Sequence, residues 1–392
     1  MLPNVDERAL PVLGQLTAED LGLDAAQRAA FARAQELPLP VWKRTNLGTL
    51  DLAALKPAFG AAEIEATPEG GVYVADLQTA LVERPEIVVK HWGTAVAPDF
   101  NKFVAFNAAL ARDGVVVHVP RNLEVAAPVR VRYRLPAAGT AIFPRTIVVA
   151  EANSRVTVIE EFVSDDLGTL GLVVPVAEIF ARDGAAVDFV SLQTLGKGTY
   201  QLGAQAAIAG RDAQVNWISG AVGADVQHVD MDCRLEGNGS TLNWLGFTFG
   251  VGDQQLLWAP RVHHIGLSTT ATIQWKSAVA DTAYVVFDGM INIEHGAQGT
   301  NSDLRDNVLH LSSKARSDSI PGLEIDANEV KAGHGSTSGQ IDEEQLFYLQ
   351  SRGFSRQDAT RTIVIGFFAS IVEQITAEPV QEKVLELIEQ KI

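Results

Sequence analysis

Residues Gly210 to Trp244, GRDAQVNWISGAVGADVQHVDMDCRLEGNGSTLNW, contain one short pattern twice. A polar, glycine-containing turn comes first, and an aliphatic residue, a polar residue and a tryptophan follow it. The two copies are Val215-Asn216-Trp217 and Leu242-Asn243-Trp244. Short β-rich runs between turn residues are typical of strands joined by tight connections. The stretch therefore predicts a repeating β structure.

The same pattern recurs on both sides of this stretch, and the first positions are 31, 28, 27 and 31 residues apart. A repeat of that length without a helical pattern inside it indicates a solenoid. We predict a mainly β fold in which two strands per repeat stack into a β-helix. A long β-sandwich with chance periodicity is the alternative. The other members are Val156-Thr157-Val158, Val187-Asp188-Phe189 and Ile273-Gln274-Trp275.

Helical patterns flank the β region, so the sequence divides into a mostly helical region 1–110, a β-helix core 111–340 and a helical region 341–392. Solenoid ends expose strand edges and must be capped, so we expect helices to cover both ends. One C-terminal helix is predicted from Arg356 to about Glu378, with Pro379 breaking it. Its apolar face is broader than a helix needs to pack on its own domain.

Composition limits the classes of partner and compartment. The chain has 392 residues, 47% of them apolar, and a net charge of −17. That charge disfavours nucleic acid and anionic membrane surfaces as partners. Since no secretory signal or long apolar run is visible, we expect a cytoplasmic protein. A single cysteine, Cys233, excludes a disulfide within the chain and a cysteine-rich metal site.

His334 is the first candidate for chemistry. It lies between Gly333 and Gly335, where the β pattern gives way to helices, so we expect it on a flexible backbone. Imidazole can ligate a metal or transfer protons near neutral pH; the alternative is a turn histidine without a role. Cys233 is expected to be a small buried residue rather than a reactive thiol. The adjacent His263 and His264 point to opposite faces of a strand.

The sequence has no recognisable catalytic motif. GxxxxGK[ST], GxGxxG after a strand, HExxH and GxSxG are all absent, and the carboxylates are scattered. One alternative function is nevertheless a carbohydrate-active β-helix enzyme, a lyase or hydrolase, that uses Trp217, Trp244 and Trp275 as sugar platforms. Another is a structural β-solenoid, which would not need the long apolar C-terminal helices.

Several segments match the sequence pattern of one known family, and they include Trp42-Lys43-Arg44-Thr45, Gly114 to Pro128, Leu323-Glu324-Ile325, Val330-Lys331, His334-Gly335, Asp342 to Leu349 and Ser351-Arg352-Gly353. In these segments the chain resembles the SufB/SufD family of iron–sulfur cluster assembly proteins, and its SufD branch more than its SufB branch. SufB-like chains carry a cysteine where this chain has Gly333-His334-Gly335. The resemblance extends toward the N-terminus and covers most of the chain.

This resemblance implies a right-handed parallel β-helix and a scaffold without catalytic activity. The implied partners are a SufB-like paralogue, bound through the β-helix, and a SufC-like ATPase, which hydrolyses ATP and docks on the C-terminal helices. A homodimer is possible in isolation. No tightly bound cofactor is implied, but a transient iron–sulfur cluster at the SufB interface is, with His334 as a candidate ligand. The ATPase contacts are expected at Arg352, Gly353, Phe354 and Phe367.

Overall fold

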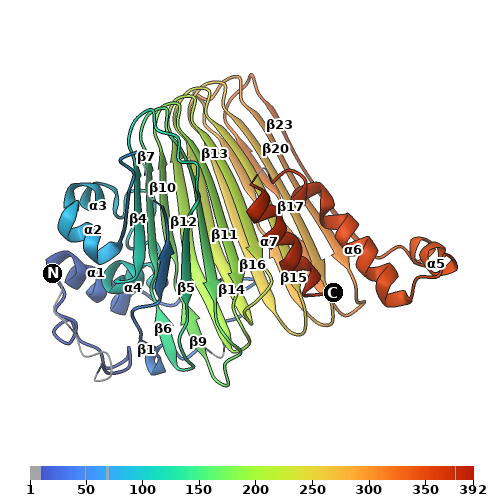
Figure 1. The fold of residues 1–392 in the computed structure, drawn as a ribbon, viewed down its shortest axis with the longest axis horizontal. Coiled ribbons are helices and arrows are strands. Elements are labelled where there is room, and N and C mark those ends of the chain that lie inside the picture. Colours follow the sequence, from blue (N-terminus) through green and yellow to red (C-terminus); the bar gives the residue numbers. More distant parts are fainter. Residues whose placement is uncertain (1–9, 49, 68–69, 376) are drawn as a thin grey trace.

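Strands from successive coils of the chain stack into two long sheets along the molecule (Figure 1). The computed structural model describes residues 10–48, 50–67, 70–375 and 377–392. Within these residues sheet A has 14 strands and sheet B has nine, and all pairs are parallel except β2–β5 and β3–β4. The sheets form a parallel β-solenoid of about 8 turns. The predicted mainly β solenoid with flanking helices is therefore confirmed.

The strands alternate between the two sheets as the chain winds. Sheet A contains β1 (Lys56–Pro57), β3 (Tyr73–Asp76), β4 (Gly114–Val119), β6 (Thr140–Ile142), β7 (Arg145–Ala150), β9 (Gly171–Val173), β10 (Val176–Ala181), β12 (Thr199–Ala209), β14 (Val226–Leu235), β16 (Gln255–His264), β18 (Tyr284–Phe287), β19 (Met290–Ile293), β21 (Arg316–Ser319) and β22 (Gly322–Ile325). Sheet B contains β2 (Ala62–Glu65), β5 (Val129–Arg134), β8 (Arg155–Val163), β11 (Ala186–Thr194), β13 (Gln214–Ala221), β15 (Thr241–Gly250), β17 (Thr270–Val279), β20 (Asn301–His310) and β23 (Lys331–Gln340).

Helices precede and follow the parallel strands. The N-terminal region has α1 (Ala25–Glu36), the short 3₁₀ helix η2 (Leu52–Ala54), α2 (Leu77–Glu83), α3 (Pro85–His91) and α4 (Lys102–Leu110). The C-terminal region has α5 (Glu343–Ser351), α6 (Arg356–Val372) and α7 (Glu378–Glu389). The proposed boundaries at residues 110 and 340 thus fall between α4 and β4 and between β23 and α5.

The sequence repeat matches the register of sheet B for four of its five members. Val156, Val187, Val215 and Leu242 are successive partners across β8, β11, β13 and β15. Equivalent residues therefore occupy equivalent places in consecutive coils.

The fifth member was aligned wrongly by two residues, because Leu242 pairs with Ala271 rather than with Ile273. Trp275 consequently lies opposite Gly246, where a Cβ atom would stand 2.2 Å from the indole. The glycine provides the space that the larger ring occupies. Aligning the tryptophans by residue type hid this shift.

The N-terminal region closes the first end of the solenoid. β2 and β3 pair antiparallel with β5 and β4, so the first parallel strand of each sheet has a neighbour. Ala61 and Val72 are buried in the same apolar cluster as Val115 and Val117. Hydrophobic side chains therefore fill the interior at this end, and Figure 1 shows α1 to α4 beside it.

A buried ion pair fastens the N-terminal region to sheet A. The Arg145 guanidinium lies 2.5 Å from the Glu178 carboxylate, and both side chains are fully buried. Arg145 also lies 4.1 Å from the centroid of the Trp92 ring. Glu178 accepts hydrogen bonds from backbone N–H groups after α3, including those of Gly93 and Ala95. Removing either charge would leave the other buried without its counter-ion.

The expectation that helices also cap the last coil is wrong. α6 and α7 lie along the outer face of sheet B instead, and α6 contacts β15 and β17. Val364, Phe368 and Ile371 of α6 are buried there, and Phe247 and Phe249 of β15 belong to the same cluster. The broad apolar face is thus used mainly to pack the helix on its own chain.

α6 also ends earlier than predicted. It stops at Val372 rather than near Glu378, and Pro379 does not break it. Pro379 instead lies in the first turn of α7, where a backbone N–H would have no helical partner in any case. Proline therefore marks the start of the last helix.

Candidate functional site

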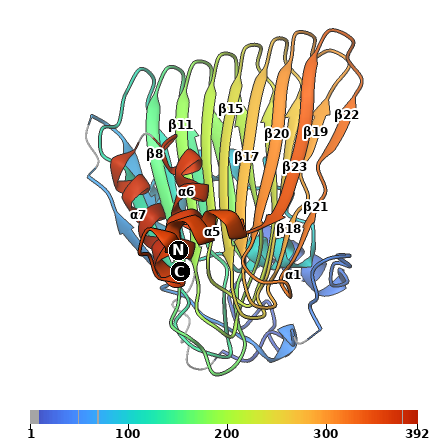
Figure 2. The ribbon, with the colours of Figure 1, turned by 90° about the vertical axis from the view of Figure 1, so that its right-hand side faces the viewer.

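The last coil leaves the edges of both sheets open. Within the described part of the chain, β23 pairs only with β20, β21 only with β18, and β22 only with β19. Figure 2 looks toward this end, where the three strands form the outermost layer. A strand edge presents unpaired N–H and C=O groups that can pair with another chain. We call this surface, residues 316–340, the open edge.

His334 lies in the middle of β23 and not in a flexible turn. Gly333 and Gly335 beside it do not have positive φ, so the expected unusual backbone is wrong. His334 pairs in register with Leu304, whose side chain is buried in the interior cluster. Residues in register on parallel strands face the same side, so the imidazole faces the interior. It is nevertheless exposed, because no further coil of the described chain covers it.

A second exposed surface lies on α5. Leu346 is buried, while Phe347 is 73% and Tyr348 56% exposed, and Phe354 in the following turn is 43% exposed. Figure 1 shows α5 standing away from the two sheets, beyond α6. Exposed aromatic side chains gathered on one element are typical of protein-binding sites. We call Phe347, Tyr348, Arg352 and Phe354 the α5 surface.

Local contacts hold the α5 surface in shape. The Arg352 guanidinium donates a 3.0 Å hydrogen bond to the Tyr348 hydroxyl and lies 5.2 Å from that ring's centroid. Gly353 has a φ of +100°, which a residue with a side chain adopts only with strain. Arg356 donates two hydrogen bonds to Glu343, joining the start of α6 to α5. The predicted contact residues Arg352, Gly353 and Phe354 are thus together and exposed.

Phe367 lies apart from them. Its ring is half-buried, and the Lys276 ammonium lies 4.6 Å from the ring centroid while donating to the Phe367 carbonyl. Phe367 therefore has partners on its own chain, and its contact with another protein stays a prediction. Phe347 and Tyr348 were not singled out from the sequence. Three consecutive apolar residues, Leu346 to Tyr348, could have indicated them, since they cannot all face one core.

The remaining sequence candidates are structural. Cys233 is buried, and burial raises the pKa of its thiol well above the ordinary value, so it is not a reactive thiolate. Trp217, Trp244 and Trp275 are buried inside the solenoid, so their use as sugar platforms is wrong. Rings of Trp217 and Trp244 stack with centroids 4.5 Å apart. His264 is also buried, and desolvation lowers its pKa to about 4.

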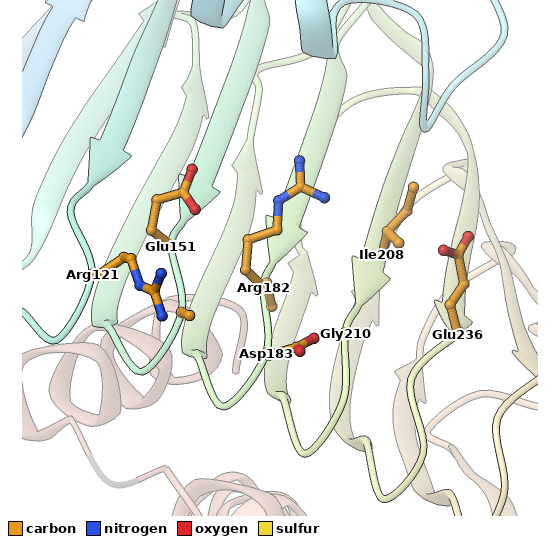
Figure 3. A pocket seen from close by; sticks show the side chains of 9 residues that line it. Arg121, Glu151, Arg182, Asp183, Ile208, Gly210 and Glu236 are labelled. Carbon is orange, nitrogen blue, oxygen red and sulfur yellow. The ribbon is translucent and has the colours of Figure 1, made fainter.

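A depression of about 360 Å³ lies where strands of sheet A enter their turns. Figure 3 shows its charged side chains, among them Glu151, Arg182 and Glu236, spread over successive coils. They do not converge on one point as a catalytic set would. The Arg182 guanidinium instead contacts Nε2 of His91 at 2.8 Å, which ties sheet A to α3. The depression therefore has charged side chains in its lining but no visible reaction centre.

Neither a metal site nor a membrane segment is complete within the described residues. No three His, Cys, Asp or Glu side chains converge closely enough there to hold a metal ion by themselves. None of the described helices is both long and apolar enough to cross a membrane. Any metal held at the open edge therefore needs ligands from elsewhere in addition.

Comparisons with known proteins agree with this architecture. Residues 133–367 match the SufBD core domain of the SUF system for FeS cluster assembly, and residues 46–131 match the SufBD N-terminal region. The chain is 32% identical to iron–sulfur cluster assembly protein SufD of Bacillus subtilis over 82% of this chain and 74% of that one. It is 29% identical to SufB of the same organism over 79% of this chain and 66% of that one. The chain therefore belongs to the SufBD family of iron–sulfur cluster assembly proteins and is SufD-like.

Proposed function

We propose that this chain is the SufD-like scaffold subunit of a complex that assembles iron–sulfur clusters in the cytoplasm. In this proposal it pairs with a SufB-like chain through the open edge and docks a SufC-like ATPase on the α5 surface. ATP is hydrolysed by that ATPase, while this chain has no catalytic role. The single observation that carries the proposal is the open edge, whose longest strand is the ten-residue β23, with His334 exposed near its centre.

The open edge supports pairing by strand addition. β23 is hydrogen-bonded on one side only in the described chain, and its outward side chains are small or polar. Backbone groups of an added strand supply affinity, and the side chains between them supply specificity. A solenoid of the same family presents a coil of matching width, which makes a SufB-like chain a better fit than an unrelated protein.

His334 is then positioned to ligate iron delivered as cargo at the contact between the two chains. Imidazole nitrogen binds iron well beside thiolate ligands. Because the ring is exposed only until a second chain covers the open edge, the ligand set would be completed by pairing. This agrees with the absence of three converging metal ligands within the described residues.

The test is cluster formation on the assembled complex. His334→Ala should leave the complex intact and lower the amount of cluster formed, measured by visible absorption during anaerobic reconstitution. His295→Ala is the matched control, because His295 is also exposed but lies in a turn, with Nδ1 3.2 Å from the Asp326 carbonyl. Cluster formation at the wild-type rate by the His334 variant would reject the ligand role.

Docking of the ATPase is tested separately. Phe347→Asp and Phe354→Asp should each weaken co-purification of the SufC-like partner, because they place a charge where we expect an aromatic contact. Phe100→Asp is the control, since Phe100 is 54% exposed in the N-terminal region. Unchanged co-purification by both α5 variants would reject this docking surface.

A further inference from the structure

One column of inward-facing positions in sheet B is polar along most of the solenoid. Successive register partners in this column are Glu160, Ser191, Ser219, Gly246, Trp275, Asp306 and Ser336. The column contains two acidic side chains, Glu160 in β8 and Asp306 in β20. Each is only 1% exposed, and desolvation by burial raises the pKa of each to about 7. The two carboxyl groups therefore face the same cost of burial.

Glu160 has hydrogen-bond partners for both oxygens. Oε1 accepts from the Ser191 hydroxyl at 2.8 Å and from the Gln205 amide at 2.5 Å. Oε2 accepts from the Thr146 hydroxyl at 3.1 Å, and the Tyr133 hydroxyl contacts that of Thr146 at 2.9 Å. Such a carboxyl group is compensated within its own chain.

Asp306 differs, because neither of its oxygens has a hydrogen-bond partner in the described structure. Ser319 is the neighbour that most favours the charged form, but its hydroxyl oxygen also lacks a partner by geometry. A buried polar group without a partner is costly, and buried charges are normally paired or bound to a metal. Asp306 lies one coil beneath the open edge, whereas Glu160 lies in β8, near the closed first end of the solenoid. Of the two acidic residues in this column, the one without a partner is therefore the one next to the open edge.

His334 faces the same interior as Asp306. Leu304 pairs with His334 and Asp306 pairs with Ser336, so the imidazole is two residues from the position above the carboxylate. Parallel strands lie about 4.8 Å apart and rise about 3.3 Å per residue, so the Cα atoms of residues in this diagonal relation are about 8 Å apart. The two side chains extend into the same interior from these backbone positions. One ion between them can bind both, because carboxylate oxygen and imidazole nitrogen each bind transition metals at about 2.1 Å.

We propose that Asp306 and His334 together bind a divalent transition-metal ion, ferrous iron in the proposed function, at the open end of the solenoid. The inference rests on that function for the identity of the metal and adds Asp306 as a ligand from beneath the edge. The carboxylate supplies the charge, the imidazole supplies nitrogen, and the hydroxyls of Ser319 and Ser336 line the space between the coils. Further ligands come from water in the free chain and from the partner in the complex.

Thermal unfolding of the full chain under anaerobic conditions, with and without 1 mM ferrous iron, provides a test without cluster assembly. A ligand bound only by the folded state raises the unfolding temperature. We expect a rise of roughly 2–4 °C at this concentration of ferrous iron. Asp306→Asn should lose most of this rise, and His334→Ala should reduce it. Glu160→Gln is the matched control and should keep the full rise. Asp306→Ser provides a second variant if the asparagine protein does not fold.

Three results would overturn the inference: no rise for the wild-type chain, an equal rise for the Asp306 variants, or an equal rise with magnesium in place of iron. Cluster formation in the complex separates this inference from the proposed function. If His334→Ala blocks cluster formation while Asp306→Asn keeps the full iron-dependent rise, the proposed function stands and the inference falls. If both variants form clusters normally while Asp306→Asn loses the rise, the metal site stands and the proposed function falls.

Discussion

The two ends of the solenoid solve the problem of exposed strand edges in opposite ways. At the first end, β2 and β3 cover the edges, and Ala61 and Val72 close the interior with apolar side chains. At the last end, β21 to β23 have no outer neighbour in the described chain, and the inward residues include His334. The first end shows that added strands and apolar side chains can cover both sheet edges and the interior of such a solenoid. The open edge is therefore best understood as a surface for a partner.

The charges inside the molecule differ in the same way. Near the closed end, Arg145 and Glu178 neutralise each other, and Glu160 has three hydrogen-bond donors. Near the open end, Asp306 has none. The difference is that the buried carboxylates Glu160 and Glu178 have partners within the described chain, whereas the buried carboxylate of Asp306 does not.

Breaking the closed end should have the largest effect. Arg145→Met leaves the Glu178 carboxylate buried without its counter-ion, which should lower the free energy of unfolding by about 3–5 kcal/mol. Chemical denaturation of the isolated chain measures this loss. Lys331→Met in β23 is the control, and it should change the free energy by less than about 0.5 kcal/mol because Lys331 is exposed. A small loss for the Arg145 variant would show that the N-terminal region is not fastened in this way.

The buried carboxyl group of Glu160 should make the free energy of unfolding depend on pH. Desolvation by burial raises its folded-state pKa from the ordinary value of 4.5 to about 7. The folded state then holds a proton that the unfolded state releases, so stability falls as pH rises from about 4.5 to 7. At about 1.4 kcal/mol per pKa unit, this contributes roughly 3 kcal/mol. Glu160→Gln should remove that part of the decline. Chemical denaturation at pH 4.5, 6 and 8 measures the free energy of unfolding of both proteins. An equal decline with pH in the wild-type chain and the variant would contradict the prediction.

Gly353 tests whether the turn after α5 holds the α5 surface in the shape that docking needs. Its φ of +100° makes alanine strained, although an added Cβ would meet no atom within 4 Å. Gly353→Ala should therefore cost about 1–2 kcal/mol through the backbone alone and displace Phe354. We expect weaker binding of the ATPase in a pull-down, with Gly366→Ala as control, since Gly366 is exposed within α6. Equal binding by both variants would separate this turn from docking.

The smallest effect on folding should come from the open edge itself. An added Cβ at Gly335 meets no atom within 4 Å, so Gly335→Lys should change stability by less than about 0.5 kcal/mol. A lysine on an edge strand opposes pairing with another strand. Analytical ultracentrifugation with the SufB-like partner should therefore show weakened pairing by a normally folded chain. Full pairing would contradict the role of this edge.

Much of the solenoid was predictable because its signal is local. The turn and strand pattern repeats in sequence, so Val156, Val187, Val215 and Leu242 could be aligned before their register was known. The shift at Trp275 was not visible, because it depends on the space left by Gly246 in the coil before it.

The site was only partly predictable. His334 was recognisable from its residue type and neighbours, but its strand conformation and its orientation depend on pairing with β20. The apolar face of α6 could not be assigned to sheet B or to a partner from periodicity alone. Asp306 was missed because it stands between Arg305 and Asn307, in a polar run that is typical of a solvent-facing segment. Only the register places it inside.

Hydrogen exchange of the backbone amides most directly tests the claim that the open edge is the pairing surface. The chain is compared alone and in complex with its SufB-like partner. We predict that amides in residues 331–340 become protected by at least about tenfold in the complex, while those in α1 to α4 at the closed end do not change. Unchanged exchange in β23, with protection appearing at the closed end instead, would contradict the account.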